Sequence, residues 1–197
     1  VDKVKRKVRL ASGLNADNHL NASAIARGLE CLRFFAERLQ DIPPQNVRIV
    51  ATATLRIATN RDEFLSLANN ILGQKINLLS GKQEAENIYL GVAHTSCGPK
   101  ERFVIDIGGA STELILGDGF VTKQVESLDI GCVTFNKLYF SDDALTIEHF
   151  TKAITGAKKV IAPLVARYKS TGWQLVLSGS GTMQALSEIQ RFTHQSS

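Results

Sequence analysis

Three apolar runs joined by short glycine turns between residues 102 and 129 limit the possible fold more than any other feature. The runs are "RFVIDIG", "TELILGDG" and "VTKQVESLD". Links this short leave no room for a crossover helix, so the runs predict neighbouring antiparallel strands. A helical pattern over about 146–170, a strand at 173–179 and a final helical pattern follow. This half is therefore predicted to be α/β, in the order β-β-β-α-β-α.

The first half alternates between strand and helix patterns and predicts β-α-β-α-β-α. The expected elements are a strand at 3–10, a helix capped by Asn21, a strand at 46–52, a helix at 61–72, a strand at 75–80 and a helix from Gly81. Two more strands at its start would make this half match the second. We therefore predict a duplicated architecture, with a partial first domain at 1–95, a second domain at 96–197 and "SCGPKE" (96–101) as the junction.

Composition excludes several classes of protein. With 44% hydrophobic and 21% charged residues the chain is predicted to be soluble, and no apolar run approaches the roughly 20 residues that cross a membrane. Three cysteines without metal-ligand spacing predict free thiols and a cytoplasmic location. The basic start, with Lys3, Lys5, Arg6, Lys7 and Arg9, is interpreted as a guarded sheet edge. We expect neither a nucleic-acid nor a membrane partner.

The stretch "DIGGASTELILG" (106–117) is the first candidate site. Glycines tolerate tight turns, so Gly108 and Gly109 let backbone amides face a phosphate, and Ser111 and Thr112 add hydroxyl donors. Two acids flank these residues, Asp106 and Glu113. Acids repel phosphate, so they make sense as ligands of Mg²⁺ between them and the phosphate. The alternative is an ordinary hairpin with exposed acids.

Three further features are candidates, each with a structural alternative. The loop "LSGSGT" (177–182) offers a second phosphate site before a helix, or a plain turn; its candidate residues are Gly179, Ser180, Gly181 and Thr182. Glu84, in the first turn of a helix, is a candidate general base or a favourable charge at a helix start. Arg56 is a candidate phosphate clamp or a surface ion-pair partner.

Five strings in a fixed order carry a resemblance to a known family. They are "VATATLRIATNRDEFL", "SGKQEAENIYLGV", "FVIDIGGASTEL", "SLDIGCVTFNKLYF" and "GSGTMQAL". Together they resemble the exopolyphosphatase/guanosine pentaphosphate phosphatase (Ppx/GppA) family of the actin-like ATPase superfamily. "ATATLR" and "GGASTEL", with Ala110, are most similar to its guanosine pentaphosphate branch.

The resemblance implies an α/β fold of two actin-like (ribonuclease H-like) ATPase domains with a cleft between them, the first lacking its N-terminal strands. It implies an Mg²⁺-dependent phosphohydrolase that removes the 5′ terminal phosphate of pppGpp to give ppGpp in the stringent response, terminal phosphates of polyphosphate, or both. Glu84 then corresponds to the catalytic glutamate, Asp106 and Glu113 to the metal-linked acids, and the two glycine loops to phosphate sites. Gln83 and Glu86 differ from the family pattern.

The resemblance also places the family's first phosphate loop before Val1 and further sequence after Ser197. We therefore expect the 1–197 chain alone to be inactive and expect a homodimer to be possible only in the intact protein. Two other functions stay open at this point: an ATP-dependent kinase of the same superfamily, and a non-catalytic module that senses phosphate or nucleotide.

Overall fold

The computed structural model describes residues 3–142 and 144–195, and the chain divides into two compact units, 1–80 and 81–197. Each unit has its own apolar core. The helix at 81–95 belongs to the second unit, whereas the sequence suggested a junction after it. It belongs there because Ala85 and Tyr89 pack in one core cluster with Val104 and Ile115 of that unit's sheet.

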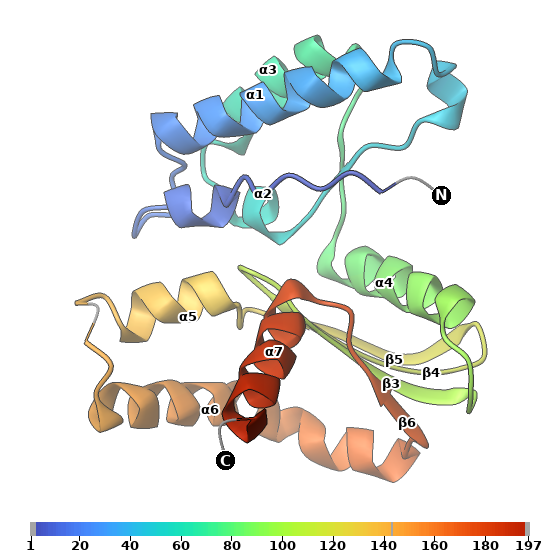
Figure 1. The fold of residues 1–197 in the computed structure, drawn as a ribbon, viewed down its shortest axis with the longest axis vertical. Helices are drawn as coiled ribbons and strands as arrows, with labels where there is room; N and C mark the ends of the chain where they lie inside the picture. The colour runs from blue at the N-terminus through green and yellow to red at the C-terminus, as the bar shows by residue number, and fades with distance from the viewer. Residues whose placement is uncertain (1–2, 143, 196–197) are drawn as a thin grey trace. The chain divides into compact units, whose positions relative to one another are not determined.

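The first unit consists mainly of helices (Figure 1). Its elements are η1 (Leu10–Gly13), α1 (Ala22–Leu39), η2 (Pro44–Asn46), β1 (Val50–Ala51), α2 (Ala53–Ile57), α3 (Arg61–Leu72) and β2 (Asn77–Leu78). The predicted cap is confirmed, because the side chain of Asn21 accepts the amide of Ala24 at 2.8 Å. Gly28 of α1 faces Phe64 of α3 so closely that a Cβ there would lie 2.7 Å from the ring. The core of this unit is thus built on the α1–α3 contact.

The strand predictions for the first unit were confirmed in part: strands form at 50–51 and 77–78, within two of the three predicted runs. Residues 3–9 form no strand, and the runs at 46–52 and 75–80 pair only through β1 and β2, two residues each, in parallel. A strand pattern becomes a strand only where a neighbour supplies hydrogen bonds. Within the described residues of this unit, the apolar faces are instead covered by α1 and α3.

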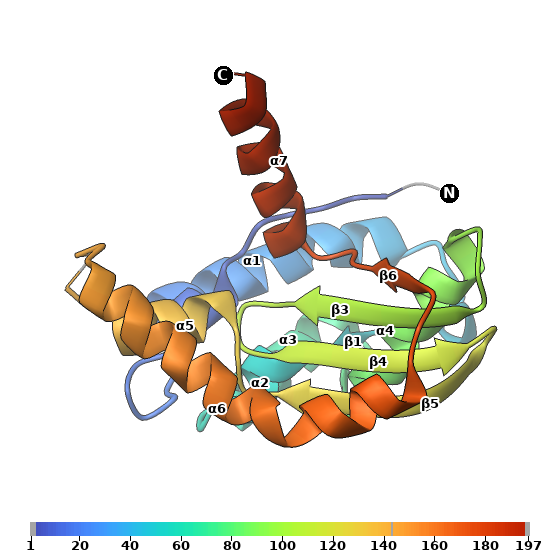
Figure 2. The same cartoon turned by 90° about the horizontal axis from the view of Figure 1, so that it is seen from below.

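The second unit is a four-stranded sheet covered by helices (Figure 2). Its elements are α4 (Gly81–Thr95), β3 (Glu101–Ile107), β4 (Thr112–Asp118), β5 (Val121–Leu128), α5 (Cys132–Tyr139), α6 (Ile147–Thr171), β6 (Leu175–Leu177) and α7 (Gly181–Gln195). The strand order is β5-β4-β3-β6, and the predicted antiparallel pairing of the first three strands is confirmed. Strand β6 runs parallel to β3, and α5 was not predicted.

The two faces of this sheet pack on different helices. Val104 and Ile115 face α4, and Leu114 and Leu116 face Tyr168 of α6. Side chains alternate along a strand, so Asp106, two residues after Val104, and Glu113, two before Ile115, share the α4 face. Among the described helices, none is both long and apolar enough to cross a membrane.

Candidate active site in the second unit

Two of the predicted acids are direct cross-strand partners. Asp106, near the end of β3, pairs in register with Glu113, near the start of β4. Both lie on the sheet face that α4 covers, and Glu84 lies in the first turn of α4. The structure therefore places Glu84, from a separate helix, on the same sheet face as the two acids of the β3–β4 hairpin.

The charges of these carboxylates act on one another. Burial raises the pKa of Asp106, the negative charge of Glu84 raises it further, and a hydrogen bond from Ser180 lowers it. Burial likewise raises the pKa of Glu113, against hydrogen bonds from two serine hydroxyls, and the charges of Glu84 and Asp106 add to the rise. The negative charge at this site is therefore only partly compensated by the protein.

Glu113 is held by hydroxyl groups from both neighbouring segments. Ser111 and Ser127 donate to the same oxygen, Oε1, at 2.6 Å and 2.8 Å. The carboxylate is almost fully buried, with 2% of the residue exposed. Ser127 was missed in the sequence, although it is the β5 residue in register with Glu113. Once the two hairpins are aligned, that register identifies it.

The diglycine loop is tied down by the start of α5. The carbonyls of Gly108 and Gly109 accept the amides of Cys132 and Val133 at 3.0 Å and 2.9 Å, and the amide of Gly108 donates to Ser111 at 2.9 Å. The amide of Gly108 is therefore already used within the loop. Neither Gly108 nor Gly109 has a positive φ, since the described positive-φ glycines are Gly73, Gly98, Gly119 and Gly172.

Gly131 is a glycine whose lack of a side chain lets two backbone segments approach closely. A Cβ at Gly131 would lie 2.3 Å from the carbonyl oxygen of Gly109 and 2.5 Å from the carbonyl carbon of Ala110. The hydroxyl of Thr112 donates to the carbonyl of Ile130, just before it. Gly131 therefore lets α5 approach the loop, and "DIGC" was the overlooked signal: a glycine directly before a helix.

The second glycine loop lies beside the first. Strands β6 and β3 are parallel neighbours, so their carboxyl ends lie at one edge of the sheet, where ligands of open α/β sheets bind. The hydroxyl of Ser180 acts to lower the pKa of Asp106, and it accepts the amide of Met183 at 3.3 Å. A Cβ on Gly179 or Gly181 would meet nothing within 4 Å, and Thr182 is half-buried. The loop therefore acts on Asp106 through Ser180.

Two other positions have local partners. Arg56 lies in α2 of the first unit and donates through Nη1 to the carbonyl of Leu79 at 3.0 Å, so its phosphate contact stays a prediction. Glu86 pairs with Lys82 on α4, with Nζ and Oε1 3.9 Å apart. This pairing distinguishes Glu86 from Glu84, which acts on the other two acids.

The acids fit one mode of Mg²⁺ binding. Within the described residues, no three histidine, cysteine or acidic side chains converge to hold a metal ion by themselves. Mg²⁺ is often held by only one or two carboxylates together with substrate phosphate oxygens. Glu113 supplies a buried carboxylate and Asp106 a half-buried one, and the negative charge of the two is only partly compensated. They therefore fit an ion whose remaining ligands come from substrate and water.

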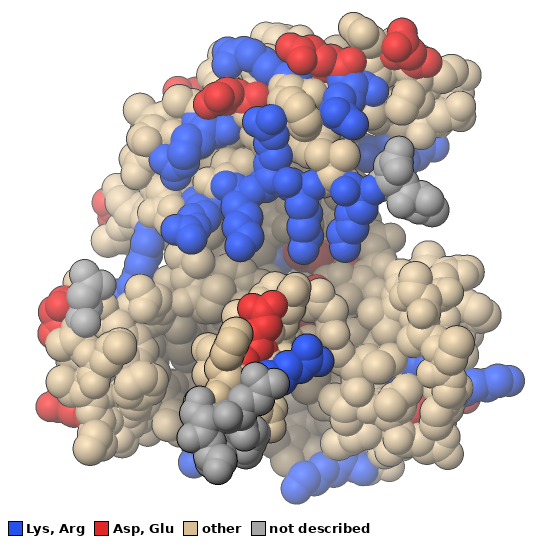
Figure 3. Space-filling model, viewed as in Figure 1, with Lys and Arg blue, Asp and Glu red and all other residues tan. Residues whose placement is uncertain are grey.

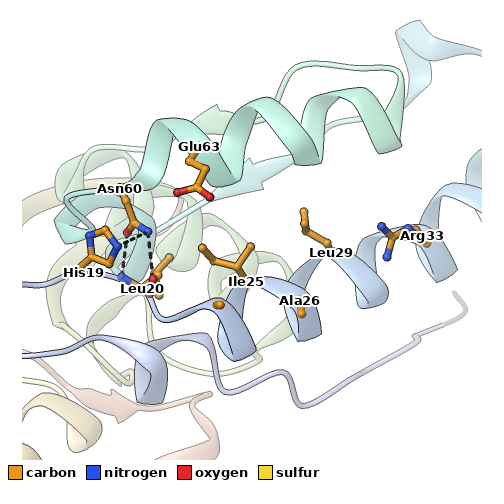
Figure 4. Close-up of a pocket in the computed structure, with 9 residues that line it drawn as sticks. His19, Leu20, Ile25, Ala26, Leu29, Arg33, Asn60 and Glu63 are labelled. Atoms are coloured by element: carbon orange, nitrogen blue, oxygen red, sulfur yellow. Dashed lines mark hydrogen bonds between the residues drawn. The ribbon is translucent and has the colours of Figure 1, made fainter.

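The first unit has a hollow whose lining residues include none of the candidate phosphate or metal ligands (Figure 4). Its volume is about 370 Å³, and it lies between α1 and α3, with Ile25 and Leu29 on its apolar side and His19 and Glu63 at its rim. Asn60 donates to and accepts from the backbone of Leu20 beside it. None of the residues predicted to bind phosphate or metal lines it, and we assign it no role.

Comparison with known proteins gives one consistent result. The Ppx/GppA phosphatase family matches residues 1–196. The chain is 57% identical over 187 residues to guanosine-5′-triphosphate,3′-diphosphate pyrophosphatase of Aliivibrio fischeri strain MJ11, covering 95% of this chain and 38% of that protein. The same figures hold for the protein of that name from Vibrio parahaemolyticus. The chain thus spans well under half the length of these relatives.

Solved structures are similar over nearly the whole chain. An exopolyphosphatase-like protein has a TM-score of 0.84 at 26% identity, covering 92% of this chain and 59% of the other. The Ppx/GppA family member of Aquifex aeolicus has a TM-score of 0.70 at 26% identity, covering 94% and 59%. The α/β fold of this chain therefore matches about three-fifths of each of those chains.

Proposed function

Because this chain belongs to the Ppx/GppA phosphatase family, we propose that the intact protein hydrolyses phosphoanhydride bonds. Its proposed substrate is pppGpp, which loses the 5′ terminal phosphate to give ppGpp; terminal phosphates of inorganic polyphosphate are a second substrate. The convergence of Glu84, Asp106 and Glu113 beside the diglycine loop is the observation that carries this proposal. The names of the relatives at 57% identity support pppGpp over polyphosphate as the main substrate.

The proposed reaction is attack by water on the terminal phosphorus. The anhydride P–O bond breaks, the nucleotide leaves with the bond electrons, and the proton of the water passes to a carboxylate of Glu84. Such a reaction depends on positioning and charge neutralisation, with little covalent work for the protein. The half-buried Glu84 is suited to the role, since it lies in the first turn of a helix on the same sheet face as the other acids.

Asp106 and Glu113 are proposed to hold Mg²⁺, which would neutralise charge on the transferred phosphate. Ser111 and Ser127 keep the Glu113 carboxylate in one orientation, because both donate to Oε1. Oε2 receives no hydrogen bond that the structure records from the described residues, so it is the oxygen proposed to face the ion. Gly109, Ala110 and the Ser180 loop would surround the phosphate.

The family resemblance extends the proposal beyond this unit. Both units are proposed to be actin-like domains, with the substrate held in a cleft. Arg56 would be a contribution of the first unit, and an N-terminal phosphate loop would complete the site.

Phosphate release is the test of this function. The intact protein is incubated with pppGpp and Mg²⁺ without any nucleoside diphosphate, and orthophosphate and ppGpp are measured together. We expect the two products in equal amounts and no reaction with excess chelator. Turnover that requires ADP or another acceptor would favour the kinase alternative, and absence of turnover would favour a non-catalytic module.

A further inference from the structure

The amino-terminal segment carries an unusual density of positive charge. Five of the seven residues from 3 to 9 are Lys or Arg, and all five are exposed. Figure 3 shows Lys and Arg side chains gathered in a row where this segment crosses the first unit. Alternate side chains of an extended chain point the same way, roughly 7 Å apart. Lys3, Lys5 and Lys7, which we call the basic row, have this spacing.

No acid among the described residues forms an ion pair with the basic row. Within the described residues, ion pairs join lysines or arginines to acids at several other places, for example Lys82 to Glu86 and Lys123 to Asp118. None of those ion pairs includes Lys3, Lys5 or Lys7. The segment is therefore a local source of positive potential, which attracts anions from solution.

Two arginines attach this segment to α1. The guanidinium carbon of Arg6 lies 3.7 Å from the centre of the Phe34 ring, a cation–π contact. Arg27 of α1 donates through Nε to the carbonyl of Val8 at 3.4 Å and through Nη1 to Ser23 at 2.8 Å. These contacts connect the basic row to an 18-residue helix.

A surface hollow continues the positive surface at the end of the row. It has a volume of about 600 Å³ and is lined by Lys7, Val8, Arg9, Ser12 and Arg27. Three of these five side chains are cationic, and none of the described residues that line the hollow is acidic. Row and hollow together make a linear cationic surface on the first unit.

This surface is better suited to polyphosphate than to nucleic acid or to a single nucleotide. Single-stranded nucleic acids bind where bases can stack on aromatic rings, but the Phe34 ring is covered by Arg6 and contacts Phe35 at its edge. A nucleotide is compact and would reach only part of the row. A polyphosphate chain is a linear anion without bases, and it matches a linear row of flexible ammonium groups.

Building on the proposed phosphohydrolase activity, we propose that the basic row and the adjoining hollow form an accessory site for polyphosphate. The site binds phosphates distant from the one being removed, so it favours long chains over short ones. Lysine contacts to phosphate release counterions, and each adds about 0.7 to the dependence of log K on log salt. Three lysines are then expected to contribute a slope of about 2 and roughly tenfold in affinity at low salt.

The test compares two triple variants of the intact protein with the same change in charge. One is Lys3→Gln, Lys5→Gln and Lys7→Gln. The matched control is Lys158→Gln, Lys159→Gln and Lys169→Gln, three exposed lysines of α6 in the second unit. Binding of fluorescently labelled long-chain polyphosphate is measured by anisotropy from 50 to 200 mM salt. We expect the first variant to lose roughly tenfold in affinity and about 2 in salt slope, and the control to keep both.

Hydrolysis and competition complete the test. The KM for long-chain polyphosphate should rise in the first variant, while the KM for tripolyphosphate and pppGpp and all kcat values stay the same. Equal loss of affinity in both triple variants would overturn the proposal, as would displacement of polyphosphate by single-stranded DNA of equal charge. The binding assay does not depend on turnover. If the protein binds long chains through this row but hydrolyses nothing, the accessory site stands and only the proposed function is refuted.

Discussion

Replacing Gly131 with alanine should separate the diglycine loop from the helix that holds it. The new Cβ would lie 2.3 Å from the carbonyl oxygen of Gly109, and contacts shorter than 3.0 Å essentially never occur. Opening the contact from 2.3 to 3.0 Å moves the loop or α5 by about 0.7 Å. Because the nearest atoms are all backbone, no side-chain rotation relieves the contact.

The displacement predicts two separate losses. Forcing an extra methyl into a packed contact typically destabilises by about 1–3 kcal/mol. A shift of about 1 Å at reacting groups can lower turnover by about a hundredfold, so we expect kcat to fall by about tenfold to a hundredfold. The amides of Cys132 and Val133 hold the loop through its carbonyls. A shift of the loop should therefore misplace the reacting phosphate, so that kcat falls more than the affinity for substrate.

The assay is phosphate release from pppGpp, with thermal unfolding measured on the same samples. Gly91→Ala is the control, since Gly91 is an exposed residue of α4 where a Cβ meets nothing within 4 Å. That change should leave kcat unaltered and slightly raise stability. A Gly131→Ala protein with wild-type kcat would show that the close approach of α5 does not position the loop.

Two other predictions concern the acids. Ser127→Ala removes one of the two donors to Glu113 and should raise the Mg²⁺ concentration for half-maximal rate several-fold. Calorimetric titration with Mg²⁺ measures the same affinity independently of turnover. Unchanged Mg²⁺ affinity in the rate assay and in calorimetry would make Ser127 merely structural. The pKa values of Asp106 and Glu113 are raised in the folded chain, so the folded state binds more protons than the unfolded state just above the ordinary carboxyl range. Without metal, the free energy of unfolding should therefore fall as pH rises from about 4 through these raised values. In denaturant titrations at several pH values, the double variant Asp106→Asn, Glu113→Gln should show a weaker dependence of this free energy on pH. The same pH dependence in variant and wild type would contradict the burial of these charges.

The sequence predicted the local features of the second unit well. The short glycine turns of 102–129 led to the correct antiparallel order, and the strand ends placed Asp106 beside Glu113. The capping asparagine identified the start of α1, and the helix predicted at 61–72 matches α3, which Gly73 ends at a φ of 62°. These features are set by turn length, capping and periodicity, which act over a few residues.

The features that the sequence did not predict depend on distant contacts. Residues 3–9 alternate like a strand but have no ladder in the structure. The start of α5 is held by carbonyls of a loop more than 20 residues away, and its short pattern gave no clear helical stripe. Ser127 and Gly131 matter through their neighbours on β4 and in the loop. Such contacts become visible only when strand register and helix placement are known.

The most direct test of the central claim compares two glutamates of the same helix. Glu84→Gln and Glu86→Gln remove one negative charge each, two residues apart on α4, but Glu86 pairs with Lys82 while Glu84 acts on Asp106 and Glu113. Single-turnover hydrolysis of pppGpp by the intact protein measures the chemical step. We predict that Glu84→Gln lowers that rate by about 10²–10⁴, the usual effect of losing a general base, and that Glu86→Gln changes it less than threefold or so. Equal rates for the two variants would contradict the assignment of Glu84 as the base and, with it, this account of the site.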